Sequence, residues 1–252
     1  RPHIFLNVQK IINKIVKMLN NLAIIPALSG SKGLKDKNIK LLLGHPMIWY
    51  SVQAALESKQ FNEVMVSTDS EEYARIARKC GAEVPFMRSA ETSSDRASSW
   101  DVVREVLLNY KAMGKEFDTV MLLQPTSPLR KAQDIVNAYR LMAEKNADSV
   151  VGVCEMDHSP MWSNVLPENC CLEGFIQDEV KERGRQALDT YYRINGALYL
   201  TKLDYSNLTF DLYTQNGFAY KMEKSSSVDV DDLLDFAVAE AILKRDYFQN
   251  SK

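Results

Sequence analysis

The chain has 252 residues, of which 46% are hydrophobic and 25% are charged, and its formal net charge is −2. These fractions are typical of a soluble globular protein, and the balanced charge excludes the broad basic surface of a general nucleic-acid-binding protein. We also expect no membrane partner, because no apolar run approaches the roughly 20 residues that cross a bilayer. The four cysteines lack C-x-x-C spacing, which predicts neither a zinc site nor a disulfide framework and favours a cytoplasmic location.

Residues 1–21 differ in kind from the rest of the chain. Apolar residues recur there at helical spacing from Ile4 to Leu19, accompanied by lysines and by no acidic residue. One interpretation is an amphipathic helix that lies on a membrane or packs on a partner. The other is an N-terminal extension that does not belong to the native protein, since Met18 stands where a natural start would be. We expect the extension, followed by one domain over residues 22–250.

Beyond residue 21, apolar stretches alternate with segments of helical periodicity. The apolar stretches show no polar alternation, which is typical of strands buried on both faces of a sheet. We predict strands from about Leu22 and over Glu63–Ser67, Thr119–Leu123, Ser149–Cys154 and Asn195–Leu200, and helices over Met47–Glu57, Ser70–Cys80, Ser99–Ala112, Lys131–Glu144 and Asp232–Tyr247. This alternation predicts an α/β domain with a mostly parallel, doubly wound sheet. Ligands of such sheets bind beyond the carboxyl ends of the strands.

The pattern becomes irregular over residues 155–190. Prolines and glycines recur in this segment, and large apolar residues such as Trp162 and Phe175 stand among polar ones. We interpret the segment as an inserted arm or as an element that contacts another subunit.

A loop of glycines and lysines follows the first strand, from Leu28 to Asn38. Gly30 and Gly33 can adopt backbone angles that turn successive N–H groups toward an anion, and the lysines can neutralise its charge. The loop fits a triphosphate, although Ser, Gly and Lys also form ordinary solvated turns. It has neither G-x-x-x-x-G-K-[ST] nor G-x-G-x-x-G spacing, which argues against a P-loop NTPase and against a dinucleotide-binding dehydrogenase.

Asp229 and Asp231 flank Val230 immediately before the last predicted helix. Alternate residues of an extended segment point the same way, so the two carboxylates could hold one hard cation. Mg²⁺ suits them because it combines a few carboxylates with phosphates and waters. The alternative is a structural role, because acidic residues are favoured at helix N-termini and Asp231 or Asp232 could be the cap.

Further polar residues lie in the loops after the other strands. The stretch from Gln124 to Arg130 contains two prolines, which predicts either a stiff loop that presents Gln124 at the ligand crevice or a simple turn before a helix. Arg88 lies in another loop that enters a helix. Arg185 and Arg193 have no obvious acidic partners in the sequence, and a guanidinium suits a carboxylate, although each is more often a surface charge.

Taken together, these motifs resemble those of a known family. The chain carries, in this order, Ile-Pro-Ala-x-Ser-Gly-Ser-Lys-Gly-Leu-x-x-Lys-Asn, Val-Ser-Thr-Asp, Leu-Gln-Pro-Thr-Ser-Pro-Leu-Arg, Asn-Gly-Ala-x-Tyr and Asp-Val-Asp. From about Leu22 to Tyr247 it resembles the cytidylyltransferases that make CMP-activated nonulosonic acids, the CMP-N-acetylneuraminate synthetases. The resemblance implies a Rossmann-like nucleotidyltransferase fold and transfer of CMP from CTP to the anomeric hydroxyl of a nine-carbon sugar acid, with release of pyrophosphate. It also implies a homodimer in which the arm over residues 155–190 reaches the partner.

The resemblance further implies roles for single residues. The metal-binding pair, with Mg²⁺ as the metal, is Asp229 and Asp231. The positions of the triphosphate loop are Ser31, Lys32, Lys37 and Asn38, and those that line the cytidine pocket are Arg88, Ala97 and Ser99. The positions that face the sugar acid are Gln124, Arg185 and Tyr199, with Arg185 as the partner of its carboxylate. We expect Lys32, Lys37 and Asp231 to take part in catalysis.

The chain departs from the family at Leu28, a nucleotide-site position where the family pattern carries an arginine that contacts the phosphates. Leucine supplies neither a charge nor a hydrogen bond, and the loss of such a contact in the transition state is worth on the order of 2–4 kcal/mol. Lys32, Lys35 or Lys37 could compensate. The alternative is a catalytically impaired or inactive paralogue that only binds sugar nucleotides. Legionaminic or pseudaminic acid as the acceptor, or a base other than cytosine, also stays open.

Overall fold

The computed structural model describes residues 19–30, 33–94, 96–182 and 188–250. The amphipathic stretch predicted from Ile4 lies almost entirely outside the described residues, so both of its interpretations stay predictions. In the described ranges, no helix combines the length and the apolar character that a membrane span requires.

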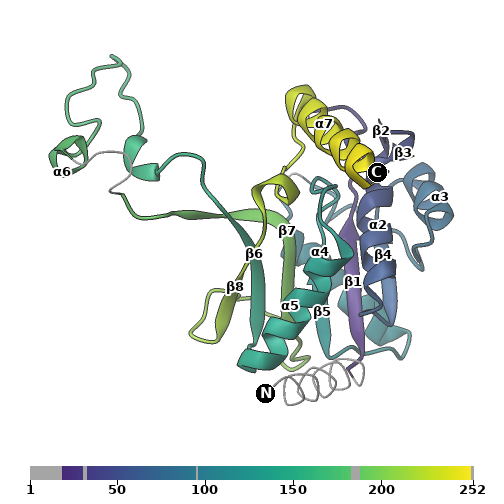
Figure 1. The fold of residues 1–252 in the computed structure, drawn as a ribbon. Coiled ribbons are helices and arrows are strands. Elements are labelled where there is room, and N and C mark those ends of the chain that lie inside the picture. The colour runs from purple at the N-terminus through teal and green to yellow at the C-terminus, as the bar shows by residue number, and fades with distance from the viewer. Residues whose placement is uncertain (1–18, 31–32, 95, 183–187, 251–252) are drawn as a thin grey trace, which may run out of the picture.

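A six-stranded sheet forms the centre of the described part of the chain (Figure 1). Its strands are β1 (Asn21–Pro26), β4 (Glu63–Ser67), β5 (Thr119–Leu122), β6 (Ser149–Glu155), β7 (Tyr192–Lys202) and β8 (Gly217–Lys221). They lie side by side in the order β4-β1-β5-β7-β6-β8. β1 and β5 are buried along almost their whole length, as their apolar residues predict. The prediction of a mostly parallel α/β sheet is confirmed.

One strand runs against the others. β7 pairs antiparallel with both β5 and β6, whereas β1 pairs parallel with β4 and β5, and β6 pairs parallel with β8. β7 is antiparallel because the chain returns to the sheet from the arm and not through a crossover helix packed on a face. β8 was not predicted, since its position at the edge of the sheet leaves it only partly buried.

Helices cover both faces of the sheet, and the residues of β1 show how. Ala23 and Ile25 belong to one buried cluster, with residues of α2, α3 and α5. Leu22 and Ile24 belong to a second cluster, with residues of α4, because alternate side chains of a strand point to opposite faces. The helices are α2 (Met47–Ser58), α3 (Glu71–Lys79), α4 (Ser99–Ala112), α5 (Ala132–Lys145) and α7 (Leu233–Asn250).

Serine residues fix the starts of two helices. Ser98 caps α4 in a capping box: its hydroxyl accepts a hydrogen bond from the backbone N–H of Asp101, whose carboxylate accepts one from the backbone N–H of Ser98. Ser70 caps α3 by accepting from the backbone N–H of Tyr73.

Shorter elements lie between the main ones. A small antiparallel pair, β2 (Leu41–Leu42) and β3 (His45–Pro46), precedes α2. Turns of 3-10 helix are η1 (Lys37–Ile39), η2 (Pro160–Trp162) and η4 (Lys224–Ser226). η1 matters most for the site, because it contains Lys37 and Asn38, the last two residues of the glycine and lysine loop.

The segment between β6 and β7 projects away from the sheet (Figure 1). It carries η2 and the short helix α6 (Asp178–Glu182). Large apolar side chains of its described part are exposed, with Val165 at 87% and Leu172 at 67%. The irregular segment predicted over residues 155–190 therefore presents apolar surface that its own domain does not cover.

Candidate functional site

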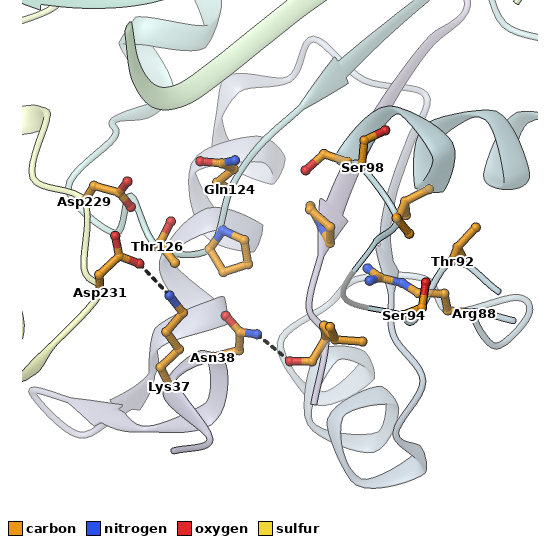
Figure 2. A pocket seen from close by; sticks show the side chains of 16 residues that line it. Lys37, Asn38, Arg88, Thr92, Ser94, Ser98, Gln124, Thr126, Asp229 and Asp231 are labelled. Carbon is orange, nitrogen blue, oxygen red and sulfur yellow. Dashed lines mark hydrogen bonds and ion pairs between the residues drawn. The ribbon is translucent and has the colours of Figure 1, made fainter. Parts of the chain in front are cut away.

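A cavity of about 370 Å³ lies beyond the carboxyl ends of β1, β4 and β5. Its described lining is Pro26, Leu28, Lys37, Asn38, Arg88, Thr92, Ser94, Ala97, Ser98, Ser99, Val102, Gln124, Pro125, Thr126, Asp229 and Asp231. Figure 2 shows two groups of polar side chains on opposite sides of the cavity. We call one the carboxylate end (Lys37, Thr126, Asp229 and Asp231) and the other the serine end (Arg88, Thr92, Ser94 and Ser98).

The Asp-Val-Asp segment is held at the cavity by its central residue. Val230 is fully buried in an apolar cluster with Leu42 and Met47. Its N–H donates to the carbonyl oxygen of Thr126 at 2.8 Å, which ties the segment to the loop after β5. Burial of Val230 on one side leaves Asp229 and Asp231 on the other, and both line the cavity.

The cap of α7 is Asp232. Its carboxylate accepts hydrogen bonds from the backbone N–H groups of Leu234 at 2.8 Å and Asp235 at 2.9 Å. The carboxylate of Asp235 in turn accepts from the backbone N–H groups of Asp231 and Asp232. Because the helix N-terminus is satisfied in this way, the carboxylate of Asp231 is left for the cavity.

Asp229 lies in an environment that disfavours its negative charge. Burial raises the pKa of this carboxyl above its ordinary value, and the neighbouring Asp231 carboxylate raises it further, while the Thr126 hydroxyl and the charges of Lys37 and Arg193 lower it. Burial prevails, so the pKa of Asp229 is raised. Its Oδ1 is buried and has no hydrogen-bond partner among the described residues. A buried carboxylate oxygen without a partner is an arrangement that a bound cation would satisfy.

The chemistry of this pair suits one kind of metal. Searched over the described residues, the chain contains no group of three or more His, Cys, Asp or Glu side chains that could hold an ion. Asp229 and Asp231 alone supply two carboxylates at one end of an open cavity. Mg²⁺ fits such a site, because it keeps several waters and binds through one or two carboxylates together with substrate phosphates.

The glycine and lysine loop meets this segment. Lys37 Nζ lies 2.8 Å from Asp231 Oδ1, as the dashed line in Figure 2 marks, and 3.4 Å from the carbonyl oxygen of Val230. A Cβ built on Gly33 would lie 2.8 Å from the carbonyl oxygen of Asp231, so a residue larger than glycine could not approach as closely. The predicted triphosphate loop and the predicted metal pair therefore share one cavity.

The Val-Ser-Thr-Asp motif after β4 supports the start of the same loop. The Asp69 carboxylate accepts hydrogen bonds from the Ser29 N–H at 2.9 Å and the Ser29 hydroxyl at 2.7 Å. Burial raises the pKa of Asp69, but the two hydrogen bonds from Ser29 and the charge of Arg88 offset that rise and lower the pKa overall. Asp69 is thus an ionised anchor of the loop at neutral pH.

Two of the four predicted loop residues are described. The buried Asn38 donates from Nδ2 to the carbonyl oxygen of Leu28 at 3.0 Å, so it holds the loop closed as well as lining the cavity. Leu28 also lines the cavity and contributes no charge there. The predictions for Ser31 and Lys32 fall outside the described residues.

All three residues predicted for the cytidine pocket line the cavity, and Arg88 belongs to the serine end. Arg88 is 9% exposed, and its guanidinium donates to the Ser67 hydroxyl at 3.1 Å and to the Ser67 carbonyl oxygen at 2.8 Å. Burial lowers the pKa of Arg88, although the charges of Asp69 and Glu105 act the other way. Ala97, immediately before the cap of α4, and Ser99, the first residue of α4, line the same cavity. The structure thereby brings these three residues together.

The residues predicted for the sugar acid have different outcomes. Gln124 lines the cavity, and its side chain lies against Gly196 of β7: a Cβ built on Gly196 would stand 2.5 Å from Gln124 Oε1 and 3.8 Å from Asp229 Oδ2. Gly196 also has φ +74°, so glycine is required there on both grounds. Tyr199 does not line the cavity; its ring packs edge-on against Trp100, with 6.2 Å between the ring centroids. Arg185 lies outside the described residues.

Sequence reasoning missed one residue near the site, Arg130. It is 3% exposed, and its guanidinium donates to the carbonyl oxygens of Ala197 at 2.6 Å and Gln124 at 2.9 Å, and to the Ser51 hydroxyl. Among the described residues no carboxylate lies within 4.0 Å of it, and burial lowers the pKa of Arg130 to about 9. An arginine just before a predicted helix normally faces water, so no local pattern indicated this burial.

The fold belongs to a known class, that of the nucleotidyltransferases. The chain superposes on a CMP:2-keto-3-deoxy-manno-octonic acid synthetase in complex with CTP with a TM-score of 0.65, covering 90% of this chain and 99% of that chain. The sequence identity is 17%, so this likeness concerns the fold. Residues 22–240 match the cytidylyltransferase family, and the chain belongs to that family.

Two relatives agree with the resemblance seen in the motifs. The N-acylneuraminate cytidylyltransferase of Escherichia coli O18:K1:H7 is 34% identical over 236 residues, which are 91% of this chain and 55% of that protein. The CMP-N,N'-diacetyllegionaminic acid synthase of Legionella pneumophila is 33% identical over 230 residues, 88% of this chain and 96% of that protein. The chain therefore spans about half the length of the first relative and nearly all of the second. The predicted relationship to the CMP-sialic acid synthetases is confirmed.

Proposed function

We propose that the protein is a cytidylyltransferase that transfers CMP from CTP to the anomeric hydroxyl of a nonulosonic acid and releases pyrophosphate. The observation that carries this proposal is the meeting of Asp229, Asp231 and Lys37 at one end of a cavity whose other end offers Arg88 and several hydroxyls. The names of the Escherichia coli and Legionella relatives support the same reaction.

The two ends of the cavity suit the two parts of CTP. The base would lie at the serine end, against Arg88, Ala97 and Ser99, and the triphosphate would extend toward Lys37 and Asn38, with Ser31 and Lys32 completing the loop. The sugar hydroxyl then attacks the α-phosphorus in line, forming the new P–O bond as the bond to the β-phosphate oxygen breaks. Such a transfer needs positioning and charge neutralisation and no covalent intermediate.

Asp229 and Asp231 would hold the Mg²⁺ of the reaction. When bound, Mg²⁺ would neutralise phosphate charge and lower the pKa of the attacking hydroxyl. The buried Asp229 Oδ1 without a partner supports this role. Lys37 and Lys32 would stabilise the charge that develops on the departing pyrophosphate.

The sugar acid would lie next to Gln124, with Arg185 as the partner of its carboxylate and Tyr199 beyond. We also propose a homodimer in which the arm of one subunit reaches the site of the other. The exposed apolar residues of the arm, Val165 and Leu172 among them, support this role because a monomer would leave them in water. The cytoplasmic location stays a prediction.

A panel of acceptors tests the proposed reaction. Pyrophosphate release is measured with CTP, Mg²⁺ and, in turn, N-acetylneuraminic, legionaminic and pseudaminic acid. We expect turnover with at least one of them and none without acceptor. CTP binding in a calorimeter without pyrophosphate release from any acceptor would instead support a binding paralogue.

Leu28→Arg tests the departure from the family pattern. Restoring a guanidinium beside the phosphates is expected to raise kcat/KM for CTP by about tenfold or more, because a charge-assisted contact acts in the transition state. Leu41→Arg is the matched control: it adds the same charge at a side chain that is 64% exposed and does not line the cavity. Equal kinetics of the two variants would mean that the chain has no need of the missing arginine.

A further inference from the structure

Lys37 contacts Asp231, one of the two proposed metal ligands. Its Nζ is 2.8 Å from Asp231 Oδ1 and 3.4 Å from the carbonyl oxygen of Val230. The Lys37 side chain is 16% exposed and that of Asp231 72% exposed. The ammonium is thus held inside the cavity, against a carboxylate that remains largely open to solvent.

The backbone on both sides of Lys37 is anchored. Asp36 has φ 51°, in the left-handed region, and its carboxylate accepts a hydrogen bond from the Tyr73 hydroxyl at 3.0 Å. Asn38 is buried and donates to the carbonyl oxygen of Leu28. Because these neighbours are fixed, the charge of Lys37 can change partner by rotation of its flexible side chain alone.

The charges of the described cavity lining are balanced: the two positive charges of Lys37 and Arg88 equal the two negative charges of Asp229 and Asp231. Arg88 belongs to the serine end, so Lys37 is the described lining cation at the carboxylate end (Figure 2). Its ammonium already pairs with Asp231, one of the two carboxylates that a divalent cation would use. A lysine ammonium and a divalent cation repel each other, so the two compete for Asp231.

We propose that Lys37 holds Asp231 until a triphosphate binds, and thereby makes tight metal binding depend on the nucleotide. This inference rests on the proposed function in one respect, namely that Asp229 and Asp231 are the metal ligands. A triphosphate offers the ammonium a more highly charged partner, and the transfer of Lys37 to the phosphates releases Asp231. The coupling is reciprocal, so bound metal strengthens triphosphate binding by the same factor.

Binding of Mn²⁺ alone, without nucleotide, tests the inference. The free Mn²⁺ is measured by electron paramagnetic resonance during titration of the wild-type protein and of Lys37→Met. Lys37→Met is expected to bind Mn²⁺ about three- to tenfold more tightly, because the competing ammonium is gone. Lys37→Arg keeps a cation beside Asp231 and is expected to bind like the wild type.

Lys35→Met is the matched control. Lys35 belongs to the same loop and is exposed, and within the described ranges no carboxylate lies within 4.0 Å of it. It removes the same charge and is expected to change Mn²⁺ affinity by less than about twofold, because an exposed charge is screened. In the double variant Lys37→Met with Asp231→Asn, the gain in Mn²⁺ affinity that Lys37→Met causes should disappear.

Two outcomes would overturn the inference: Lys37→Met that binds Mn²⁺ no more tightly than the wild type, or a gain that persists in the double variant. Pyrophosphate release by the wild type is a separate readout. Turnover together with an unchanged Mn²⁺ affinity in Lys37→Met would refute the role of the lysine and leave the proposed function standing. A gain in Mn²⁺ affinity in Lys37→Met, together with no turnover on any acceptor, would support the role of the lysine and refute the proposed function.

Discussion

Replacing Asp229 with asparagine is expected to slow pyrophosphate release by about 10³-fold, and replacing Asp231 with alanine to have an effect of the same order. Each change removes a carboxylate from the proposed metal pair, and a metal ion contributes several kcal/mol to the neutralisation of charge in a phosphoryl transfer. Initial rates are measured with CTP, Mg²⁺ and the best acceptor of the panel. Removal of Mg²⁺ by a chelator should abolish turnover of the wild type.

The neighbouring Asp232 offers a matched control. Its carboxylate caps α7 and does not line the cavity. Asparagine is as good an N-cap as aspartate, so Asp232→Asn should keep both the fold and the rate. If Asp229→Asn retained more than about a tenth of the wild-type rate, the assignment of the metal pair would be wrong.

Asp229→Asn should not destabilise the metal-free protein. Burial raises the pKa of Asp229, so the folded state binds this proton more tightly than the unfolded state does. Stability therefore falls as the pH rises from the ordinary pKa through the raised one, and the ionised carboxylate makes an unfavourable contribution above it. Asparagine has the same shape without the charge. The melting temperature of Asp229→Asn in the presence of a chelator is expected to equal or exceed that of the wild type. A marked decrease would contradict this account.

Much of the fold could be predicted from the sequence because its signals are local. β1 and β5 are short apolar runs, and Ser98 with Asp101 forms a capping box that fixes the start of α4. The direction of β7 could not be predicted in this way, since it depends on how the chain returns from the arm. β8 carries a weak pattern because an edge strand buries only part of its side chains.

The candidate site also combines features with local sequence signals and features that depend on contacts between distant residues. The motifs singled out Asp229 and Asp231, which both line the cavity, but sequence spacing could not decide whether Asp231 or Asp232 caps α7. The ion pair of Lys37 with Asp231 joins residues 194 positions apart, a contact that no local pattern contains. Arg130 was missed for a related reason, because its acceptors come from α2, from the loop after β5 and from β7.

Arg130 links the site to the elements that support it. Its guanidinium fixes the backbone of Gln124 and of Ala197, which follows Gly196, and Gly196 packs against the Gln124 side chain. With a pKa of about 9 it remains a cation at pH 7, although no carboxylate among the described residues lies within 4.0 Å. A buried cation paired only with neutral acceptors is an unfavourable choice for stability alone. Its planar set of donors is well suited to fixing three elements at once.

Arg130→Met is therefore expected to lower the free energy of unfolding by about 2–4 kcal/mol, because two buried carbonyl oxygens lose their donor. For a chain of this size the melting temperature should fall by about 5–15 °C. The rate per folded molecule should also fall by about 10²-fold, since a displaced Gln124 no longer positions the acceptor. Melting curves and kinetics at a temperature where the variant is folded measure the two effects separately.

Two further variants show what the guanidinium contributes. Arg130→Lys keeps the charge but not the planar donors, so it should recover only part of the stability and of the rate. Lys131→Met removes the charge of the exposed neighbour, which does not line the cavity, and should change neither. Wild-type kcat and an unchanged KM for the sugar acid in folded Arg130→Met would show that Arg130 supports the fold and does not position the site.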